Sequence, residues 1–227
     1  MSVETAPERA LTIAWGDARS TDALLVDPPR SDALLVLAHG AGAGMRHPFM
    51  RALADSLAVE RVATLRYEFP YLQAGSKRPD PPRLLEACVR AAVAHAATLA
   101  GDRPLFAGGK SMGGRMTSQA QAAGPLAGVR ALVFFGFPLH PAKAPSVARA
   151  AHLAAVTLPM LFLQGSRDAL ADPARLRPVC AGLGERATHH EIVGADHGFA
   201  VSKRSGRTDA SVIVELAAVA AAFLRRT

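Results

Sequence analysis

Short apolar runs alternate with longer, helix-like segments along this chain. The apolar runs have the length and residue types of β-strands. They lie at Leu11–Trp15, Ala23–Val26, Ala33–Ala38, Arg61–Arg66, Pro104–Ala107, Ala131–Phe135, Met160–Gln164 and His189–Val193. Helices are predicted at Pro48–Val59, Pro82–Leu99, Ser111–Ala123, Ser146–Ala154, Pro173–Gly182 and Asp209–Arg225.

Strands that alternate with helices require parallel crossovers, and therefore predict a sheet covered by helices on both faces. The continuous apolar character of Leu34–Leu37 and Leu132–Phe135 fits strands that are buried on both sides. We expect an α/β fold with a mostly parallel, doubly wound sheet of about 7–8 strands. No repeat or compositional break marks a second domain, so we expect one domain over residues 1–227.

Composition indicates a soluble globular protein, because half of the residues are hydrophobic and no apolar run reaches the about 18 residues of a membrane span. The Ala-rich segment Val212–Leu224 contains Glu215 and is better explained as a final amphipathic helix. Residues Met1–Glu8 lack the apolar stretch of a secretory signal. We therefore expect a cytoplasmic location and no membrane partner.

The net charge of +7 could indicate a polyanion as partner. The basic residues are mostly scattered arginines, and the local clusters Lys77-Arg78 and Lys203-Arg204 are not interleaved with aromatic residues. Nucleic acid is therefore not expected as a partner. Cys88 and Cys180 lie on predicted helices without metal-ligand spacing, which favours buried free thiols over a disulfide.

The pentapeptide Gly109–Gly113 has the pattern G-x-S-x-G, which is typical of a strained turn that exposes a serine between a strand and a helix. The strand is supplied by Arg103–Ala107 and the helix by Arg115–Ala123. A phosphate-binding P-loop is the competing interpretation, but it requires a glycine where Pro104 stands. Ser111 is thus the candidate nucleophile.

Ligands of such sheets bind beyond the carboxyl ends of the strands. Four predicted strands end in loops with reactive or glycine-rich sequences: His39–Gly44, Gly109–Gly113, Gln164–Asp168 and Gly194–Gly198. These loops are expected to converge on one edge of the sheet.

A serine hydroxyl needs a base, usually a histidine that a carboxylate holds in the productive tautomer. Ser111, Asp168 and His197 occur in the Ser, Asp, His order of one family of such triads. Asp196 is a weaker candidate for the acid, because neighbouring side chains generally point apart. Asp172 is better explained as a helix N-cap.

Acyl transfer also needs donors for the oxyanion. The Met112 N–H at the helix N-terminus and the Ala41 N–H in the turn His39–Gly42 are the candidates. The same turn could be a dinucleotide fingerprint, but Met45 stands at the third glycine position and Arg66 stands where an acidic residue is required.

These residues resemble the α/β-hydrolase superfamily, over roughly Leu34 to the C-terminus. The fuller patterns His39–Gly42, Gly108–Arg115 and Gly194–His197 resemble a small group near dienelactone hydrolase. The resemblance implies the α/β-hydrolase fold and no cofactor or metal. Dienelactone hydrolase itself has a cysteine nucleophile where this chain has Ser111, so dienelactone is not the expected substrate.

The superfamily often carries a lid after the sixth strand. Only residues 136–145 separate that strand from the next predicted helix, so no large lid is expected and the substrate should be a small acyl compound. The candidate substrate-binding residues, whose aromatic members could equally belong to the core, are Gly40, Met45, Phe49, Phe69, Tyr71, Phe137, Leu139 and Phe199.

Two functions remain open at this point. The first is a serine hydrolase that cleaves a small ester or thioester. The second is a hydrolase-like protein-interaction module with a vestigial triad, because related domains occur in chromatin-associated scaffold proteins. A scaffold has no physical need for an exposed, strained serine, which favours the enzyme. The sequence does not indicate an oligomeric state.

Overall fold

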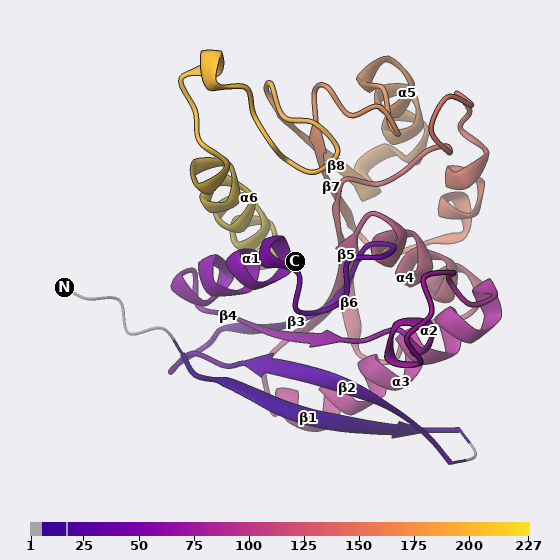
Figure 1. Cartoon of the computed structure of the whole chain (residues 1–227), viewed down its shortest axis with the longest axis vertical. Helices are drawn as coiled ribbons and strands as arrows, with labels where there is room; N and C mark the ends of the chain where they lie inside the picture. Colours follow the sequence, from indigo (N-terminus) through magenta and orange to yellow (C-terminus); the bar gives the residue numbers. More distant parts are fainter. Residues whose placement is uncertain (1–5, 17) are drawn as a thin grey trace.

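The computed structural model describes residues 6–16 and 18–227 and contains an eight-stranded sheet with the order β1-β2-β4-β3-β5-β6-β7-β8 (Figure 1). The strands are β1 Glu8–Trp15, β2 Arg19–Val26, β3 Ala33–Ala38, β4 Val62–Tyr67, β5 Leu105–Lys110, β6 Val129–Phe135, β7 Met160–Gly165 and β8 Ala187–Ile192. All predicted strands are present. Residues 1–5, part of the segment from which the absence of a secretory signal was inferred, lie outside the described residues.

Strand pairing is parallel from β4 through β3, β5, β6 and β7 to β8. Strands β1 and β2 form an antiparallel hairpin, and β2 joins the rest of the sheet antiparallel to β4. The prediction of a mostly parallel sheet is therefore confirmed, with an antiparallel hairpin added at one edge.

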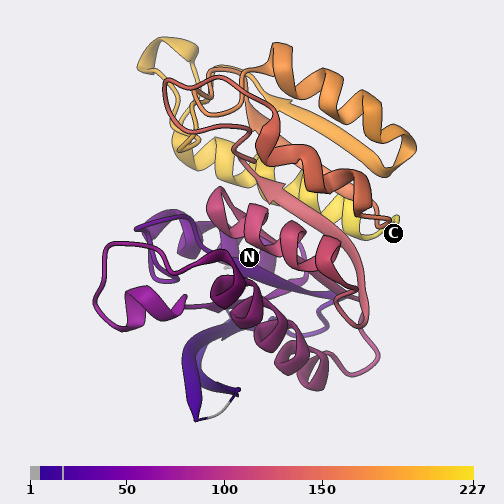
Figure 2. The ribbon, with the colours of Figure 1, turned by 90° about the vertical axis from the view of Figure 1, so that its right-hand side faces the viewer.

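Helices cover both faces of the sheet, as Figures 1 and 2 show. The α-helices are α1 Pro48–Val59, α2 Pro70–Gln73, α3 Pro82–Ala100, α4 Met112–Ala123, α5 Pro173–Leu183 and α6 Asp209–Leu224, and the 3-10 helices are η1 Ala148–Ala155, η2 Gly184–Arg186 and η3 Lys203–Ser205. The segment predicted as a helix from Ser146 is the 3-10 helix η1, and the short α2 was not predicted. Helices α1 and α6 lie on one face, and α3, α4, η1 and α5 lie on the other.

The alternation of side chains along β3 explains its unbroken apolar sequence. Leu34 and Val36 pack into the core beneath α3 and α4, whereas Leu35 and Leu37 pack into the core beneath α1 and α6. Each strand residue is therefore buried, whichever face it points to.

Two expected local features are confirmed. The Asp172 carboxylate caps α5 by accepting a hydrogen bond from the Ala174 N–H at 2.8 Å. Cys88 and Cys180 are buried free thiols. None of the helices within residues 6–16 and 18–227 has both the length and the hydropathy needed to cross a bilayer.

Candidate active site

Ser111 occupies the sharp turn between β5, which ends at Lys110, and α4, which begins at Met112. Its backbone has φ 51° and ψ −115°, a conformation that residues with a Cβ rarely adopt. Such a backbone costs on the order of 1–3 kcal/mol and persists only where the surrounding structure imposes it. The strained, serine-presenting turn expected from the sequence is thus present.

The two outer glycines of the turn are required by close backbone contacts. A Cβ added to Gly109 or to Gly113 would lie 2.4 Å from the Ala38 carbonyl oxygen. Real Cβ atoms do not approach an oxygen so closely, so both positions need glycine for β5 and α4 to pass against the end of β3. This contact brings the turn that carries Ser111 beside the loop that follows β3.

The structure brings together the three residues predicted to form the triad. His197 Nε2 lies 2.8 Å from Ser111 Oγ, and His197 Nδ1 lies 2.6 Å from Asp168 Oδ2. The imidazole therefore lies between the hydroxyl and the carboxylate. The carboxylate can accept only from a protonated Nδ1, which leaves Nε2 free to accept the serine proton.

Asp168 is held by its own set of donors at the carboxyl end of β7. Its Oδ1 accepts from the Leu170 N–H at 2.7 Å, and its Oδ2 accepts from the Gln164 amide as well as from His197. The Gln164 Oε1 in turn accepts from the Phe137 N–H at 2.9 Å. The side chain of Asp168 is fully buried, so these donors replace water as its hydrogen-bond partners.

Gln164 was not singled out from the sequence. The available signal was a polar side chain within a parallel strand whose other residues are apolar, because a buried amide there requires polar partners.

Asp196, the alternative acid, caps the loop that carries His197. Its Oδ1 accepts hydrogen bonds from the N–H groups of Gly198 at 2.8 Å and Ala200 at 3.0 Å. Of the two candidate acids, Asp168 is the one that contacts the imidazole.

The turn after β3 lies against the nucleophile turn, because a Cβ on Gly40 would lie 3.6 Å from Ser111 Cβ. Within the described residues, no acceptor is found for the Ala41 N–H, whereas the Gly42 N–H donates to the Tyr71 hydroxyl at 3.1 Å. The Met112 N–H belongs to the first turn of α4, where backbone donors lack intrahelical partners. Both expected oxyanion donors are thus available on adjoining turns.

His39 contacts this turn from its buried side. Its Nε2 accepts from the Phe69 N–H at 3.0 Å, and its Nδ1 lies 2.8 Å from the Gly40 carbonyl oxygen. The same Nε2 also lies 2.8 Å from Glu68 Oε1. The side chain is fully buried, so it contributes to the position of the turn and not to contact with a substrate.

Several residues expected to line a substrate pocket are buried. Phe69 and Phe137 have no exposed surface, and Met45, Tyr71 and Phe199 are at most 3% exposed. Phe69 packs edge-on against His39, and Phe137 packs against Phe134 and Phe162. Core packing is the alternative that the sequence left open for the aromatic residues, and contact of these side chains with a substrate stays a prediction. They follow the strand ends, where period-two alternation no longer indicates direction.

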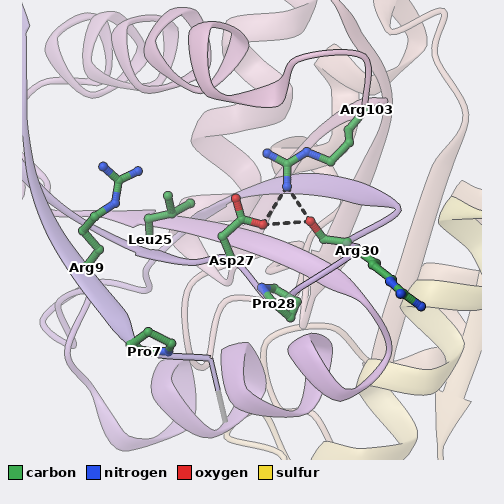
Figure 3. Close-up of a pocket in the computed structure, with 8 residues that line it drawn as sticks. Pro7, Arg9, Leu25, Asp27, Pro28, Arg30 and Arg103 are labelled. Atoms are coloured by element: carbon green, nitrogen blue, oxygen red, sulfur yellow. Dashed lines mark hydrogen bonds and ion pairs between the residues drawn. The ribbon is translucent and has the colours of Figure 1, made fainter. Parts of the chain in front are cut away.

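A cavity of about 620 Å³ lies near the amino ends of the parallel strands β3 and β5, opposite the end that carries Ser111 (Figure 3). It borders the segments that lead into β3 and β5, whereas Ser111 follows the carboxyl end of β5. Arg103 donates to Asp27 Oδ1 at 2.6 Å and also to the backbone oxygens of Leu99 and Ala100, so the protein itself occupies its guanidinium. This cavity contains none of the candidate site residues.

The overall fold is similar to that of several solved structures. Dienelactone hydrolase from Anabaena variabilis is 22% identical, with a TM-score of 0.78 over 98% of this chain and 99% of that chain. A lidless α/β serine hydrolase from Xanthomonas campestris is 19% identical, with a TM-score of 0.71 over 92% and 91% of the two chains. The esterase domain of a Rhodothermus marinus protein is 15% identical, with a TM-score of 0.73 over 97% and 98%.

These likenesses establish the fold. Only residues 136–147 connect β6 to η1, so this connection contains no large lid, as expected. The family described as the alpha/beta hydrolase domain matches residues 31–225, from just before β3 to the end of α6. That match covers the turn after β3 and the loops that carry Ser111, Asp168 and His197, and by it the chain belongs to the α/β-hydrolase domain family.

Proposed function

We propose that this protein is a serine hydrolase that cleaves small esters or thioesters, with Ser111 as nucleophile. The observation that carries the proposal is the 2.8 Å contact between His197 Nε2 and Ser111 Oγ on a strained turn. Strained backbone of this kind is concentrated at functional sites. Membership of the α/β-hydrolase family and the resemblance to a lidless serine hydrolase support the same reaction class.

The reaction follows from the positions of the groups. Ser111 Oγ attacks the carbonyl carbon of the substrate while His197 Nε2 takes the hydroxyl proton. The new oxyanion accepts hydrogen bonds from the N–H groups of Ala41 and Met112, and Asp168 stabilises the imidazolium. Collapse of the intermediate expels the alcohol or thiol, which receives the proton from His197. Water then attacks the acyl-enzyme by the same sequence and releases the acid.

The preference for a small acyl group rests on the short connection between β6 and η1, residues 136–147, which provides no large cover for a long chain. A series of p-nitrophenyl esters of increasing acyl length tests it. Activity should be highest for the short esters, and a strong preference for long chains would contradict this part of the proposal.

A fluorophosphonate probe tests the nucleophile. The wild type should be labelled, and Ser111→Ala should not be. Ser118→Ala is a matched control, because Ser118 Oγ also lies 2.8 Å from a histidine, His152 Nε2, but is fully buried and out of reach of the probe. It should keep the labelling. A folded wild type that is not labelled would refute the hydrolase proposal and favour the interaction module.

A further inference from the structure

Lys110, which directly precedes Ser111, is a buried charged residue that the proposed reaction does not use. Its Nζ donates a hydrogen bond to the backbone carbonyl oxygen of His197. The same ammonium lies 5.1 Å from the ring centre of Phe199 and 5.9 Å from that of Phe49, within the range of cation–π attraction. Adjacent residues of the elbow thus contact one histidine at two places: the ring through Ser111 and the backbone through Lys110.

Gly136 leaves the space for this contact. It follows β6 with φ 74°, and a Cβ there would lie 3.0 Å from Lys110 Nζ and 3.6 Å from His197 Nδ1. The lysine ammonium and the imidazole therefore border the same small gap beside Gly136. Lys110 cannot move to solvent from this position without giving up the His197 carbonyl.

Burial lowers the pKa of Lys110 to about 8, against the opposing effect of the nearby carboxylates of Asp168 and Asp196. At neutral pH the side chain is therefore an ammonium, and its bond to the carbonyl is charge-assisted. Above about pH 8 it becomes an amine, whose hydrogen bond is weaker and which loses the attraction to the two rings.

We propose that Lys110 is a positioning residue whose ammonium holds the loop carrying His197 so that the imidazole stays within reach of Ser111. The inference rests on the proposed function, because it assigns Lys110 a role in that same site. Asp168 fixes the ring through Nδ1, and Lys110 fixes the backbone of the same residue. The positive charge that forms on His197 during the reaction is opposed by Lys110 but offset by the Asp168 carboxylate, which contacts the imidazole.

The contact and the proton have different effects on the loop. Removing the side chain removes the hydrogen bond to His197, so the loop over residues 194–200 becomes less restrained, and kcat falls while KM changes little. Loss of the proton alone does not open the loop. Burial lowers the pKa of Lys110 in the closed site, so an opening that hydrates this side chain becomes less favourable as the pH rises above about 8.

The kinetic test compares wild type, Lys110→Arg and Lys110→Met on p-nitrophenyl acetate at neutral pH. The exposed lysine variant Lys203→Met, on the segment after His197, is the control and should keep the wild-type kcat. Lys110→Met should lose roughly tenfold in kcat, equal to about 1.4 kcal/mol, with little change in KM. Lys110→Arg keeps a charged donor and should recover part of that loss.

A wild-type kcat in Lys110→Met, or equal losses in Lys110→Met and Lys110→Arg, would overturn the proposal. A second measurement does not depend on catalysis. Hydrogen-exchange protection of residues 194–200 is measured in Ser111→Ala alone and with Lys110→Met or Lys110→Arg added. Protection of this loop should fall with Lys110→Met and be partly restored with Lys110→Arg, while protection of the rest of the sheet shows that each variant is folded.

The two proposals fail separately. Loss of protection without fluorophosphonate labelling would refute the hydrolase function and support the contact between Lys110 and the histidine loop. Labelling of Ser111 with loop protection that Lys110→Met leaves unchanged would support the hydrolase and refute the role of Lys110.

Discussion

The Tyr71 hydroxyl oxygen accepts a hydrogen bond from the Gly42 N–H at 3.1 Å. Through this bond the short helix α2 fixes the turn that provides the Ala41 N–H. Burial raises the pKa of Tyr71, so the phenol stays protonated through the working range of the site. The turn after β3 therefore depends on a side chain from the segment that follows β4.

Tyr71→Phe removes the hydroxyl and keeps the ring in the core. The Gly42 N–H then loses its acceptor and the turn relaxes, so we expect kcat to fall by roughly tenfold or less, while removal of a whole oxyanion donor costs about 10² to 10³. Initial rates on p-nitrophenyl acetate measure it. Tyr67→Phe, which removes a hydroxyl from the core beside Phe69, is the control and should keep kcat near the wild-type value. Equal losses in both variants would contradict the role of the Gly42 contact.

Asp168→Asn should lower kcat by roughly 10³- to 10⁴-fold with the fold retained. An amide nitrogen facing His197 can only donate, which moves the ring proton to Nε2 and prevents it from accepting the Ser111 proton. Asp196→Asn keeps an Oδ1 that can cap the loop, and its loss should be far smaller. Circular dichroism checks that both variants are folded. Near-wild-type turnover in folded Asp168→Asn would show that the carboxylate does not orient the histidine.

Gly113→Ala should destabilise the protein by about 1–3 kcal/mol or more, because the added Cβ would meet the backbone oxygens of Ala38 and His39. Gly182→Ala is the matched change on an open helical site, since no atom lies within 4 Å of its Cβ position, and it should stabilise by about 0.5–1 kcal/mol. Urea unfolding of both variants checks the pair. Two changes of the same sign would contradict the close contact at Gly113.

The thiols should be unreactive in the native protein. Burial raises the pKa of Cys88 to about 12 and that of Cys180 to about 11, so little thiolate forms near neutral pH. We expect neither thiol to react with Ellman's reagent before unfolding and both to react in guanidinium. Rapid stoichiometric reaction of the native protein would show that the helices carrying them open.

The order of strands and helices could be predicted because unbroken apolar runs such as Leu34–Leu37 are typical of strands buried on both faces. The meeting of Ser111, Asp168 and His197 could be predicted for a related reason, since each residue follows a parallel strand and such ends share one edge. These predictions needed only the positions of residues along the chain.

Side-chain directions beyond the strand ends could not be predicted. Phe69 and Phe137 turn into the core, and Lys110 reaches the His197 carbonyl because Gly136 leaves room there. Each outcome depends on a residue far away in the sequence. The 3-10 form of η1 was missed for another reason, because its composition is equally compatible with an α-helix.

The positive φ of Ser111 has a consequence for the stability of the folded protein. Glycine adopts positive φ without strain, so Ser111→Gly relieves the turn and makes the folded protein more stable. A lineage that kept the domain only to bind other proteins would gain stability from that single change. Ser111 thus occupies a position where glycine would be less strained, and this supports the proposed use of its hydroxyl.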